Sequence, residues 1–319
     1  MPTPDSLPTF DQLPAVEGAP PHSAWWLFGR DDQVGLFNLQ TPERIAGAAN
    51  LVTAGKMFAL NWALELPSPP LFGRGAIRQT ISAGPISHDD VLDNFYPQAS
   101  SQWDTLVHVG NSQHGFYNGI THAEVTGKPG SKGGVDHWAR RGIAGRAVVL
   151  DIGRYLESQG DPIDFTTDRR FSVEELEACR KAQGVEFEPG DVLLLRTGWT
   201  EWYTGLEQPQ RNALANMATF RAPGIASGET MARYLWDLHV VAAASDLPSL
   251  EAWPPRRDMG GFLHEWLIGL FGMAIGELWD LAGLAADCAA DRRYTCFFVS
   301  APINKLGGIG SPPNAIALK

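Results

Sequence analysis

Residues 146–153 read RAVVLDIG and residues 191–198 read DVLLLRTG, and these two stretches decide the fold. Each is a continuous apolar run that ends at a glycine, a pattern typical of strands buried on both faces of a sheet. Between them, SVEELEACRKAQG at 172–184 begins with a Ser-x-x-Glu capping box and ends at a glycine, so a helix is expected there. The succession of strand, helix and strand predicts a mixed α/β domain.

The flanking sequence extends the same pattern. Further strands are expected over 57–64, 240–245 and 295–302, and further helices over 42–54 and 229–238. No internal repeat and no long linker is visible, so we predict a single domain over residues 23–319. Residues 1–22 contain six prolines and little periodicity, which indicates an arm that is either disordered or laid across a neighbouring subunit.

Composition and charge limit the class of protein. The net charge of −11 argues against a nucleic-acid or anionic-membrane partner, because both require basic patches. The longest apolar run, at 266–276, is too short to span a bilayer. The N-terminus lacks the basic and apolar regions of a secretory signal, and the three cysteines form no CxxC pair. We therefore expect a cytoplasmic protein with a small-molecule substrate.

Several catalytic chemistries lack their sequence motifs. There is no G-x-S-x-G nucleophile elbow and no G-x-G-x-x-G after a strand. The cysteines fall on helical or strand patterns and are predicted to be core residues, and GKPGSKGG at 127–134 is predicted to be a surface loop. Histidine and carboxylate side chains remain as candidates for the chemistry.

A first candidate cluster lies in SSQWDTLVH at 100–108. If this stretch is extended, Gln102, Asp104, Leu106 and His108 all point to one face. A helix would also bring Asp104 near His108 but would turn Gln102 away. A half-exposed strand with scattered polar residues fits the spacing equally well, so the cluster is not decisive alone.

A second candidate pair, His264 and Glu277, lies in HEWLIGLFGMAIGE at 264–277. On one unbroken helix, a separation of thirteen residues would leave the two side chains on nearly opposite faces. They can converge only if the chain breaks between them, and the glycines of this stretch offer the break points. Alternatively, His264 starts a helix and Glu277 lies in the first turn of the next one.

Taken together, these segments resemble the cyclase family, whose members include kynurenine formamidase, isatin hydrolase and trans-dienelactone hydrolase. That family carries H-x-G-T-H-x-D-x-P-x-H followed far downstream by a histidine and a glutamate. In QASSQWDTLVH at 98–108, Asp104 falls on the motif aspartate and His108 on its last histidine, while His264 and Glu277 fall on the downstream pair. The resemblance covers most of the chain, including GIAGRAVVLDIG, GDVLLLRTGW and ASDLPSLE. It implies a swivelling β/β/α fold of the cyclase-like type and assembly as a homodimer or homotetramer.

Two motif histidines are replaced in this chain by Gln98 and Gln102. In the family, the motif histidines and aspartate bind a catalytic divalent metal, usually zinc or manganese. The resemblance therefore implies a metal site of Asp104, His264 and Glu277, with Gln102 as a weak amide donor. Such an oxygen-rich set favours manganese over zinc, or it holds no metal.

The resemblance implies hydrolysis of an amide, lactone or related carbonyl bond in a small cyclic or aromatic substrate, with His108 as the proton shuttle and Asp104 as its partner. A metal-independent hydrolase, lyase or cyclase that uses Asp104 and His108 is a second possibility. A catalytically silent binding protein is a third. Candidate substrate contacts are Trp103, Tyr117, Asn118 and His122.

Overall fold

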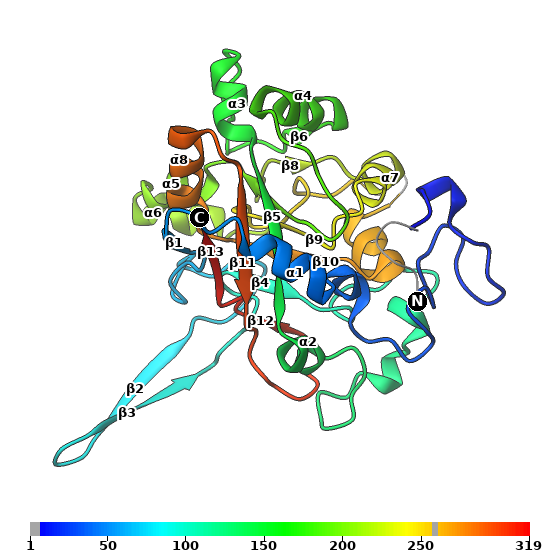
Figure 1. Cartoon of the computed structure of the whole chain (residues 1–319). Helices are drawn as coiled ribbons and strands as arrows, with labels where there is room; N and C mark the ends of the chain where they lie inside the picture. The colour runs from blue at the N-terminus through cyan, green and yellow to red at the C-terminus, as the bar shows by residue number, and fades with distance from the viewer. Residues whose placement is uncertain (1–6, 257–260) are drawn as a thin grey trace.

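The computed structural model describes residues 7–256 and 261–319, and it centres on a nine-stranded mixed sheet (Figure 1). The order of its strands is β1-β13-β11-β5-β7-β9-β10-β4-β12. These strands are β1 (Met57–Ala59), β4 (Gln102–Asp104), β5 (Ile143–Asp151), β7 (Val192–Arg196), β9 (Ala242–Ser245), β10 (Ala274–Glu277), β11 (Thr295–Ser300), β12 (Gly310–Ser311) and β13 (Ala315–Leu318). The run β5-β7-β9-β10 is parallel, and the strands on either side of it are antiparallel.

Helices flank this curled sheet, and α1 lies over β5 on the face turned to the viewer in Figure 1. The α-helices are α1 (Pro42–Ala49), α2 (Val135–Arg141), α3 (Ile152–Ser158), α4 (Val173–Gln183), α5 (Trp199–Thr204), α6 (Gln208–Leu214), α7 (Glu229–Asp237) and α8 (Ala282–Asp291). Short 3-10 turns are η2 (Phe10–Gln12), η3 (Gly35–Leu39), η4 (Tyr117–Gly119) and η5 (His122–Glu124), and η6 (Glu265–Phe271) is a π-helix. The predicted class, α/β with a mixed sheet and flanking helices, is confirmed.

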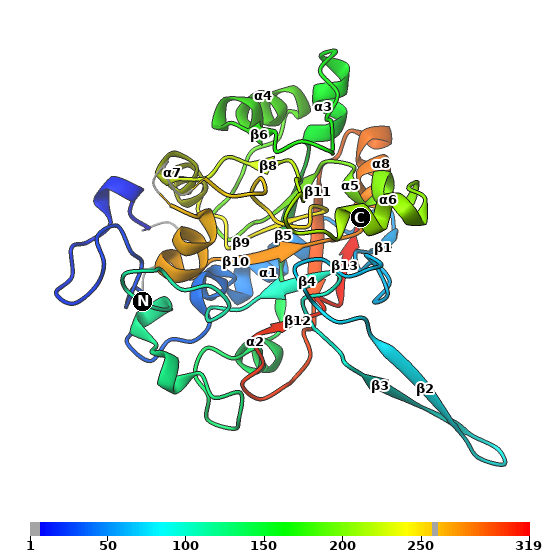
Figure 2. The ribbon, with the colours of Figure 1, turned by 180° about the vertical axis from the view of Figure 1, so that it is seen from behind.

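Two small sheets lie outside the central one. Strands β6 (Arg170–Phe171) and β8 (Gly224–Ile225) pair in parallel. Strands β2 (Arg78–Ala83) and β3 (His88–Asp93) form an antiparallel hairpin that points away from the rest of the chain (Figure 2). We predicted no element over residues 78–93. No helix in the described ranges is long and apolar enough to cross a membrane.

Strands β5 and β7, from which the fold class was predicted, lie at the centre of the sheet. In β5 and β7, Val149 pairs with Leu194, and both side chains are buried. The predicted helix over 42–54 is shorter, since α1 ends at Ala49. The predicted strand over 57–64 keeps only three residues, because β13 pairs with it over Met57–Ala59 alone.

Most buried apolar side chains form one contiguous core that extends from Phe10 to Ala317, and Val107, Phe116 and Ile120 form a small second cluster. This continuity supports the single domain that we propose for residues 23–319. Of the N-terminal arm, residues 1–6 lie outside the described residues, and residues 7–22 pack on their own chain. A wrap around a neighbouring subunit stays a prediction. Phe10 is buried, its N–H donates to the Asp237 carboxylate at 2.7 Å, and the Trp236 indole donates to the Pro8 carbonyl at 2.9 Å.

Candidate functional site

Strand β4 carries the first polar side chains of the site, because it lies between β10 and β12. Gln102 pairs with Glu277 and Asp104 with Ile275 across the antiparallel β4–β10 ladder. Side chains alternate along a strand, so Gln102 and Asp104 share one face and Trp103 occupies the other. The extended conformation considered for this stretch holds only up to Asp104, because the neighbouring β12 has only two residues and the chain then turns.

His264 and Glu277 reach the same point from the downstream stretch. His264 immediately precedes the π-helix η6, which ends at Gly272 in the left-handed region at φ +67°, and Glu277 ends strand β10. Gly272 also allows close packing, since a Cβ atom there would lie 2.6 Å from the Tyr117 ring. No single helix therefore joins His264 and Glu277, and the chain breaks between them as predicted.

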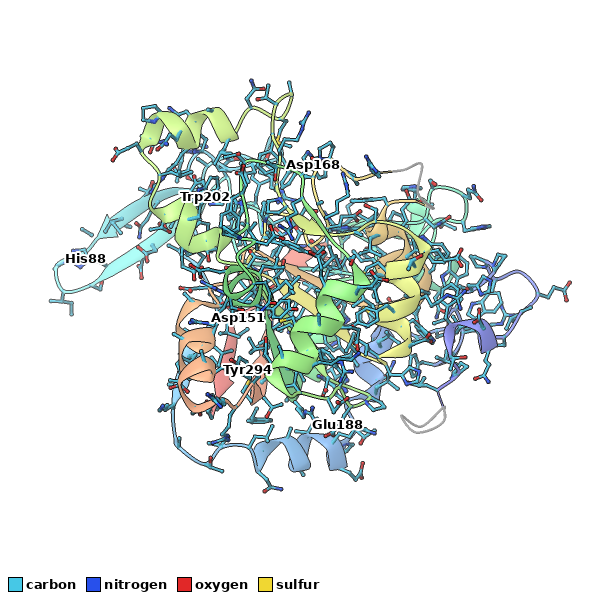
Figure 3. All side chains as sticks on the ribbon, turned by 90° about the horizontal axis from the view of Figure 1, so that it is seen from above. His88, Asp151, Asp168, Glu188, Trp202 and Tyr294 are labelled. Carbon is cyan, nitrogen blue, oxygen red and sulfur yellow. The ribbon has the colours of Figure 1, made fainter. Side chains whose placement is uncertain are left out.

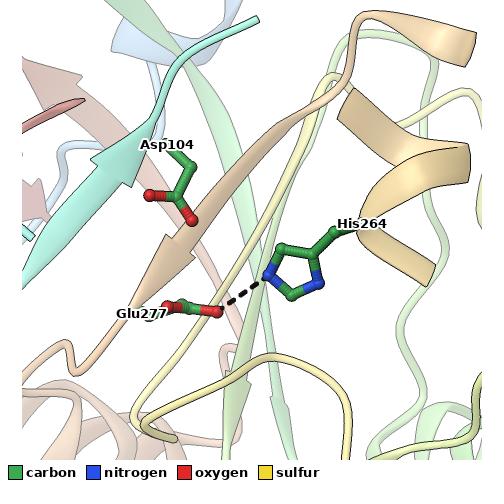
Figure 4. A group of neighbouring side chains, drawn as sticks. All are labelled: Asp104, His264 and Glu277. Carbon is green, nitrogen blue, oxygen red and sulfur yellow. Dashed lines mark hydrogen bonds and ion pairs between the residues drawn. The ribbon is translucent and has the colours of Figure 1, made fainter. Parts of the chain in front are cut away.

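The structure confirms the predicted convergence of His264 and Glu277 with Asp104 in space. His264 Nε2 lies 3.1 Å from Glu277 Oε1, and one potential ligand atom from each of Asp104, His264 and Glu277 lies within 4.8 Å of the others (Figure 4). All three side chains are buried. Their role as metal ligands stays a prediction.

The pKa shifts in the cluster arise because several carboxylates are buried close together. Burial raises the pKa of Asp104; the nearby His108 opposes that shift, and Glu277 adds to it. Burial alone would lower the pKa of His264, but its hydrogen bonds to Glu251 and Glu277 outweigh burial and raise that pKa to about 10. The His264 imidazole is therefore held between the carboxylates of Glu251 and Glu277, while Asp104 lies beside His108.

A divalent cation fits this arrangement. The Oδ2 atom of Asp104 is buried with no hydrogen-bond partner in the described structure, so one strong acceptor of this carboxylate is left unpaired. Two carboxylates and one imidazole are donors that manganese accepts well. Gln102 is placed differently from a ligand, because its Nε2 donates to Glu277 Oε2 at 2.7 Å and to Asp104 Oδ1 at 3.3 Å. Its amide oxygen instead accepts from Arg74 at 3.3 Å.

His108 lies in the turn that follows β4, and its N–H donates to the Thr105 carbonyl at 3.0 Å. This turn folds the imidazole back so that its Nε2 lies 3.6 Å from Asp104 Oδ1. The His108 side chain is 25% exposed, whereas those of Asp104, His264 and Glu277 are at most 5% exposed. His108 is thus the titratable group of this cluster that a molecule from solvent can reach.

Four predicted substrate contacts lie elsewhere. Trp103 is fully buried in the core, where its indole donates to Ser300 Oγ at 2.9 Å and meets Trp279 edge-on. It alternates with the site residues on β4 and therefore points away from them. Its position therefore does not support a substrate contact for Trp103.

The other three predicted contacts lie in the loop after the turn that holds His108; they are Tyr117, Asn118 and His122. None of them joins the cluster. Tyr117 is buried and donates to Asp32 at 3.1 Å, while Asn118 accepts from the Trp26 N–H at 2.7 Å and donates to nearby loop carbonyls. These two residues fix the loop at 26–32. His122 is exposed on η5, where its ring packs against Phe116. Substrate contact for these three residues is not supported.

One site residue that we did not predict is Glu251, at the end of the ASDLPSLE segment (residues 244–251), which begins in β9. Its Oε1 accepts from the backbone N–H of His264 at 3.1 Å and lies 2.9 Å from His264 Nδ1, and its Oε2 accepts from Ser227 Oγ at 2.5 Å. Glu251 is fully buried and holds the His264 ring with Nε2 toward Glu277. The sequence signal for Glu251 is a carboxylate in the loop after a buried parallel strand, because ligand sites of α/β sheets lie at that end of the strands.

Comparison with known proteins gives the family. A family model described as "Putative cyclase" matches residues 59–252. The chain belongs to this cyclase family. The matched region contains Asp104, His108 and Glu251, and it ends before His264 and Glu277.

Solved structures agree with this assignment. A crystal structure of a novel cyclase is 30% identical, covers 93% of this chain and 99% of its own, and superposes with a TM-score of 0.81. Isatin hydrolase A from Labrenzia aggregata, bound to benzyl benzoate, is 17% identical with a TM-score of 0.59, covering 86% of this chain and 97% of its own. Isatin hydrolase A from Ralstonia solanacearum is 17% identical with a TM-score of 0.52, covering 87% of this chain and 97% of its own. The cyclase-like fold is therefore confirmed, and curated protein sequences yield no match.

Proposed function

We propose that this cyclase-family chain is a hydrolase that cleaves an amide, lactone or related carbonyl bond in a small cyclic or aromatic substrate. The observation that carries the proposal is the buried convergence of Asp104, His264 and Glu277 beside the half-buried His108. The substrate class comes from the family, in which isatin hydrolases share this fold.

Asp104, His264 and Glu277 would hold a divalent cation, and the unpaired Oδ2 of Asp104 is the atom most in need of one. When bound, such a cation supplies Lewis acidity, which lowers the pKa of a water and polarises a carbonyl group. Glu251 acts as a positioning residue. Its hydrogen bond to Nδ1 leaves the Nε2 atom of His264 for the site, as carboxylates behind ligating histidines commonly do.

His108 performs the proton transfers. Because Nε2 faces Asp104, the other ring nitrogen, Nδ1, accepts a proton as the oxygen of water bonds to the substrate carbonyl carbon, and it then donates that proton to the leaving nitrogen or oxygen as the C–N or C–O bond breaks. Asp104, 3.6 Å from the imidazole, stabilises the transient imidazolium. The imidazole returns to its starting state after each turnover.

A second candidate function has one observation in its favour. The Gln102 amide donates to both Asp104 and Glu277, so these carboxylates have a partner without any cation. In this alternative, Asp104 orients His108 as a general base for water, in a metal-independent hydrolase, lyase or cyclase.

The test is turnover of N-formyl anilines, lactones and cyclic imides by chelator-treated protein, with and without added Mn²⁺ or Zn²⁺. Hydrolysis that requires added metal supports the first candidate. Full activity without metal supports the second. Absence of turnover on every substrate class under both conditions would contradict the assignment as a hydrolase.

A further inference from the structure

A cavity lies between helix α1 and the amino ends of strands β5 and β7. Its volume is about 650 Å³, within the range of roughly 300–1,000 Å³ that is typical of small-molecule sites. Figure 3 shows Glu188, one of its lining residues, beside α1. Gly145 and Arg146 line it from the start of β5, and Asp191 directly precedes β7. Glu277 ends strand β10 of the same parallel run, so the cavity and the candidate active site lie at opposite ends of these strands.

The floor of the cavity carries a buried amide without a partner. Gln40 is 2% exposed, and neither its Oε1 nor its Nε2 has a hydrogen-bond partner among the described residues. The backbone of Gln40 is engaged elsewhere, since its N–H donates to the Phe37 carbonyl at 3.0 Å and its carbonyl accepts from Arg141 at 2.8 Å. The side chain instead reaches the cavity wall at Gly145. An unpaired buried amide is costly, and a ligand in the cavity would supply the missing partners.

Two glycines keep the space around this amide open. A Cβ atom at Gly145 would lie 2.8 Å from Gln40 Nε2, so only glycine allows the amide to lie there. Gly47 lies inside helix α1, where glycine is an unfavourable residue. A Cβ atom at Gly47 would meet no other described element within 4 Å, so packing does not require glycine at this position. Gly47 does line the cavity, and a large side chain there would narrow it.

The charges around the cavity favour a neutral ligand. The lining contains two arginines and three carboxylates, which are Arg44, Arg146, Glu43, Glu188 and Asp191. Arg146 already pairs with Glu188, and its Nη2 lies 3.5 Å from Asp191. No net positive charge therefore remains to attract an anion. The Gln40 amide offers an acceptor next to a donor, which matches a ring with adjacent N–H and C=O groups.

We propose that this cavity binds a small neutral cyclic amide or imide, whose N–H donates to Gln40 Oε1 and whose C=O accepts from Gln40 Nε2. Glutamine side chains contact base edges in nucleic acids through the same pair of hydrogen bonds. Both amide atoms are covered in the free chain, so the amide turns toward the ligand about its last side-chain torsion, which is soft. Leu51 and Pro189 supply apolar contacts for the ring. The site is separate from the candidate active site and does not depend on the proposed hydrolysis.

Calorimetric titration of the full chain with uracil tests this site. The matched control ligand is 1,3-dimethyluracil, which keeps both carbonyl groups and lacks both N–H groups. Uracil should bind at one site per chain with a Kd of about 1 mM or tighter, and 1,3-dimethyluracil should bind at least about tenfold more weakly. The lactam 2-piperidone has the same edge outside a nucleobase. Tighter binding of uracil would identify the ligand as a nucleobase, and tighter binding of 2-piperidone would identify it as a simple lactam.

Variants of the chain locate the binding. Gln40→Leu should weaken uracil binding by at least about tenfold, while its melting temperature stays the same or rises because an unpaired amide is removed. Gly47→Phe should weaken binding by filling the cavity, whereas Ala46→Phe, one residue away on α1 and outside the lining, should not. His108→Ala should bind uracil normally. Absence of uracil binding, equal binding of 1,3-dimethyluracil, normal binding by Gln40→Leu, or loss of binding in His108→Ala would overturn the proposal.

Discussion

Replacing His108 with alanine should abolish most turnover while leaving the fold intact. The imidazole lies in a turn outside the β4 ladder, and its ring is 25% exposed. Its contact with Asp104 at 3.6 Å is longer than a hydrogen bond, and the same Oδ1 atom keeps the Gln102 amide as a partner at 3.3 Å, so losing the imidazole should cost about 1 kcal/mol. The free energy of unfolding should therefore fall by no more than about 1 kcal/mol, which shifts the melting temperature by only a few degrees.

The expected loss of activity is much larger than the loss of stability. A positioned general acid–base contributes roughly 10²- to 10⁴-fold to the rate, which corresponds to about 2.7–5.4 kcal/mol of activation free energy. We expect kcat of His108→Ala to fall by that factor. Because the turn is partly exposed, added imidazole should restore part of the activity to the alanine variant.

The chain offers a matched control for this experiment. His137 is also 25% exposed and lies 4.0 Å from an aspartate, Asp136, but it is on helix α2 outside the cluster. His137→Ala should retain normal kcat. Steady-state kinetics on a hydrolysed substrate and thermal unfolding of both variants provide the comparison. Near-normal turnover by a folded His108→Ala protein, or an equal loss in His137→Ala, would refute the assignment of His108.

Four further predictions follow from the packing and charge of particular residues. Trp103→Ala should lower the free energy of unfolding by about 3–5 kcal/mol in urea titrations, because it empties a fully buried site. Glu251→Ala should cost about 3–5 kcal/mol, because it leaves a buried imidazole without one of its two carboxylates. Burial raises the pKa of Asp191 to about 7, so the folded state holds a proton there that the unfolded state releases near pH 4. The stability of the wild type should therefore fall as pH rises from 4 to 7, and Asp191→Asn should reduce that fall. Histidine in place of both Gln98 and Gln102 should raise zinc affinity in calorimetric titrations, because imidazole suits zinc better than an amide does.

Each of these predictions has a result that would contradict it. A Trp103→Ala protein with wild-type stability would place that indole outside the core. Glu251→Ala should destabilise far more than Glu229→Ala on the exposed start of α7, and equal effects would contradict a buried positioning role. An unchanged slope of stability against pH in Asp191→Asn would contradict the raised pKa. Zinc affinity that stays the same in the double histidine variant would show that positions 98 and 102 do not face the cation.

The core of the fold was predictable because continuous apolar runs have few structural solutions. Strands β5 and β7, with helix α4 between them, were expected from sequence, since burial on both faces and capping residues are local signals. The hairpin at residues 78–93 was not expected. Its strands contain charged and polar residues on both faces, and they have no core to impose a period of two.

The site was predictable in part, for a different physical reason. Alternation along β4 correctly placed Gln102 beside Asp104, and the glycines before Glu277 correctly indicated a break in the chain. The same alternation should have excluded Trp103 as a substrate contact, because it points to the opposite face. Glu251 could not be assigned from spacing, since its contact with His264 depends on how the loop after β9 closes.

The most direct test of the account is a titration of Mn²⁺ into chelator-treated protein, followed by calorimetry, with hydrolysis measured in the same samples. The account predicts one ion bound per chain, turnover that rises in proportion to the occupied fraction, and loss of both in Glu277→Gln. Full turnover before any Mn²⁺ is added, or unchanged binding in Glu277→Gln, would contradict the claim that Asp104, His264 and Glu277 hold the catalytic cation.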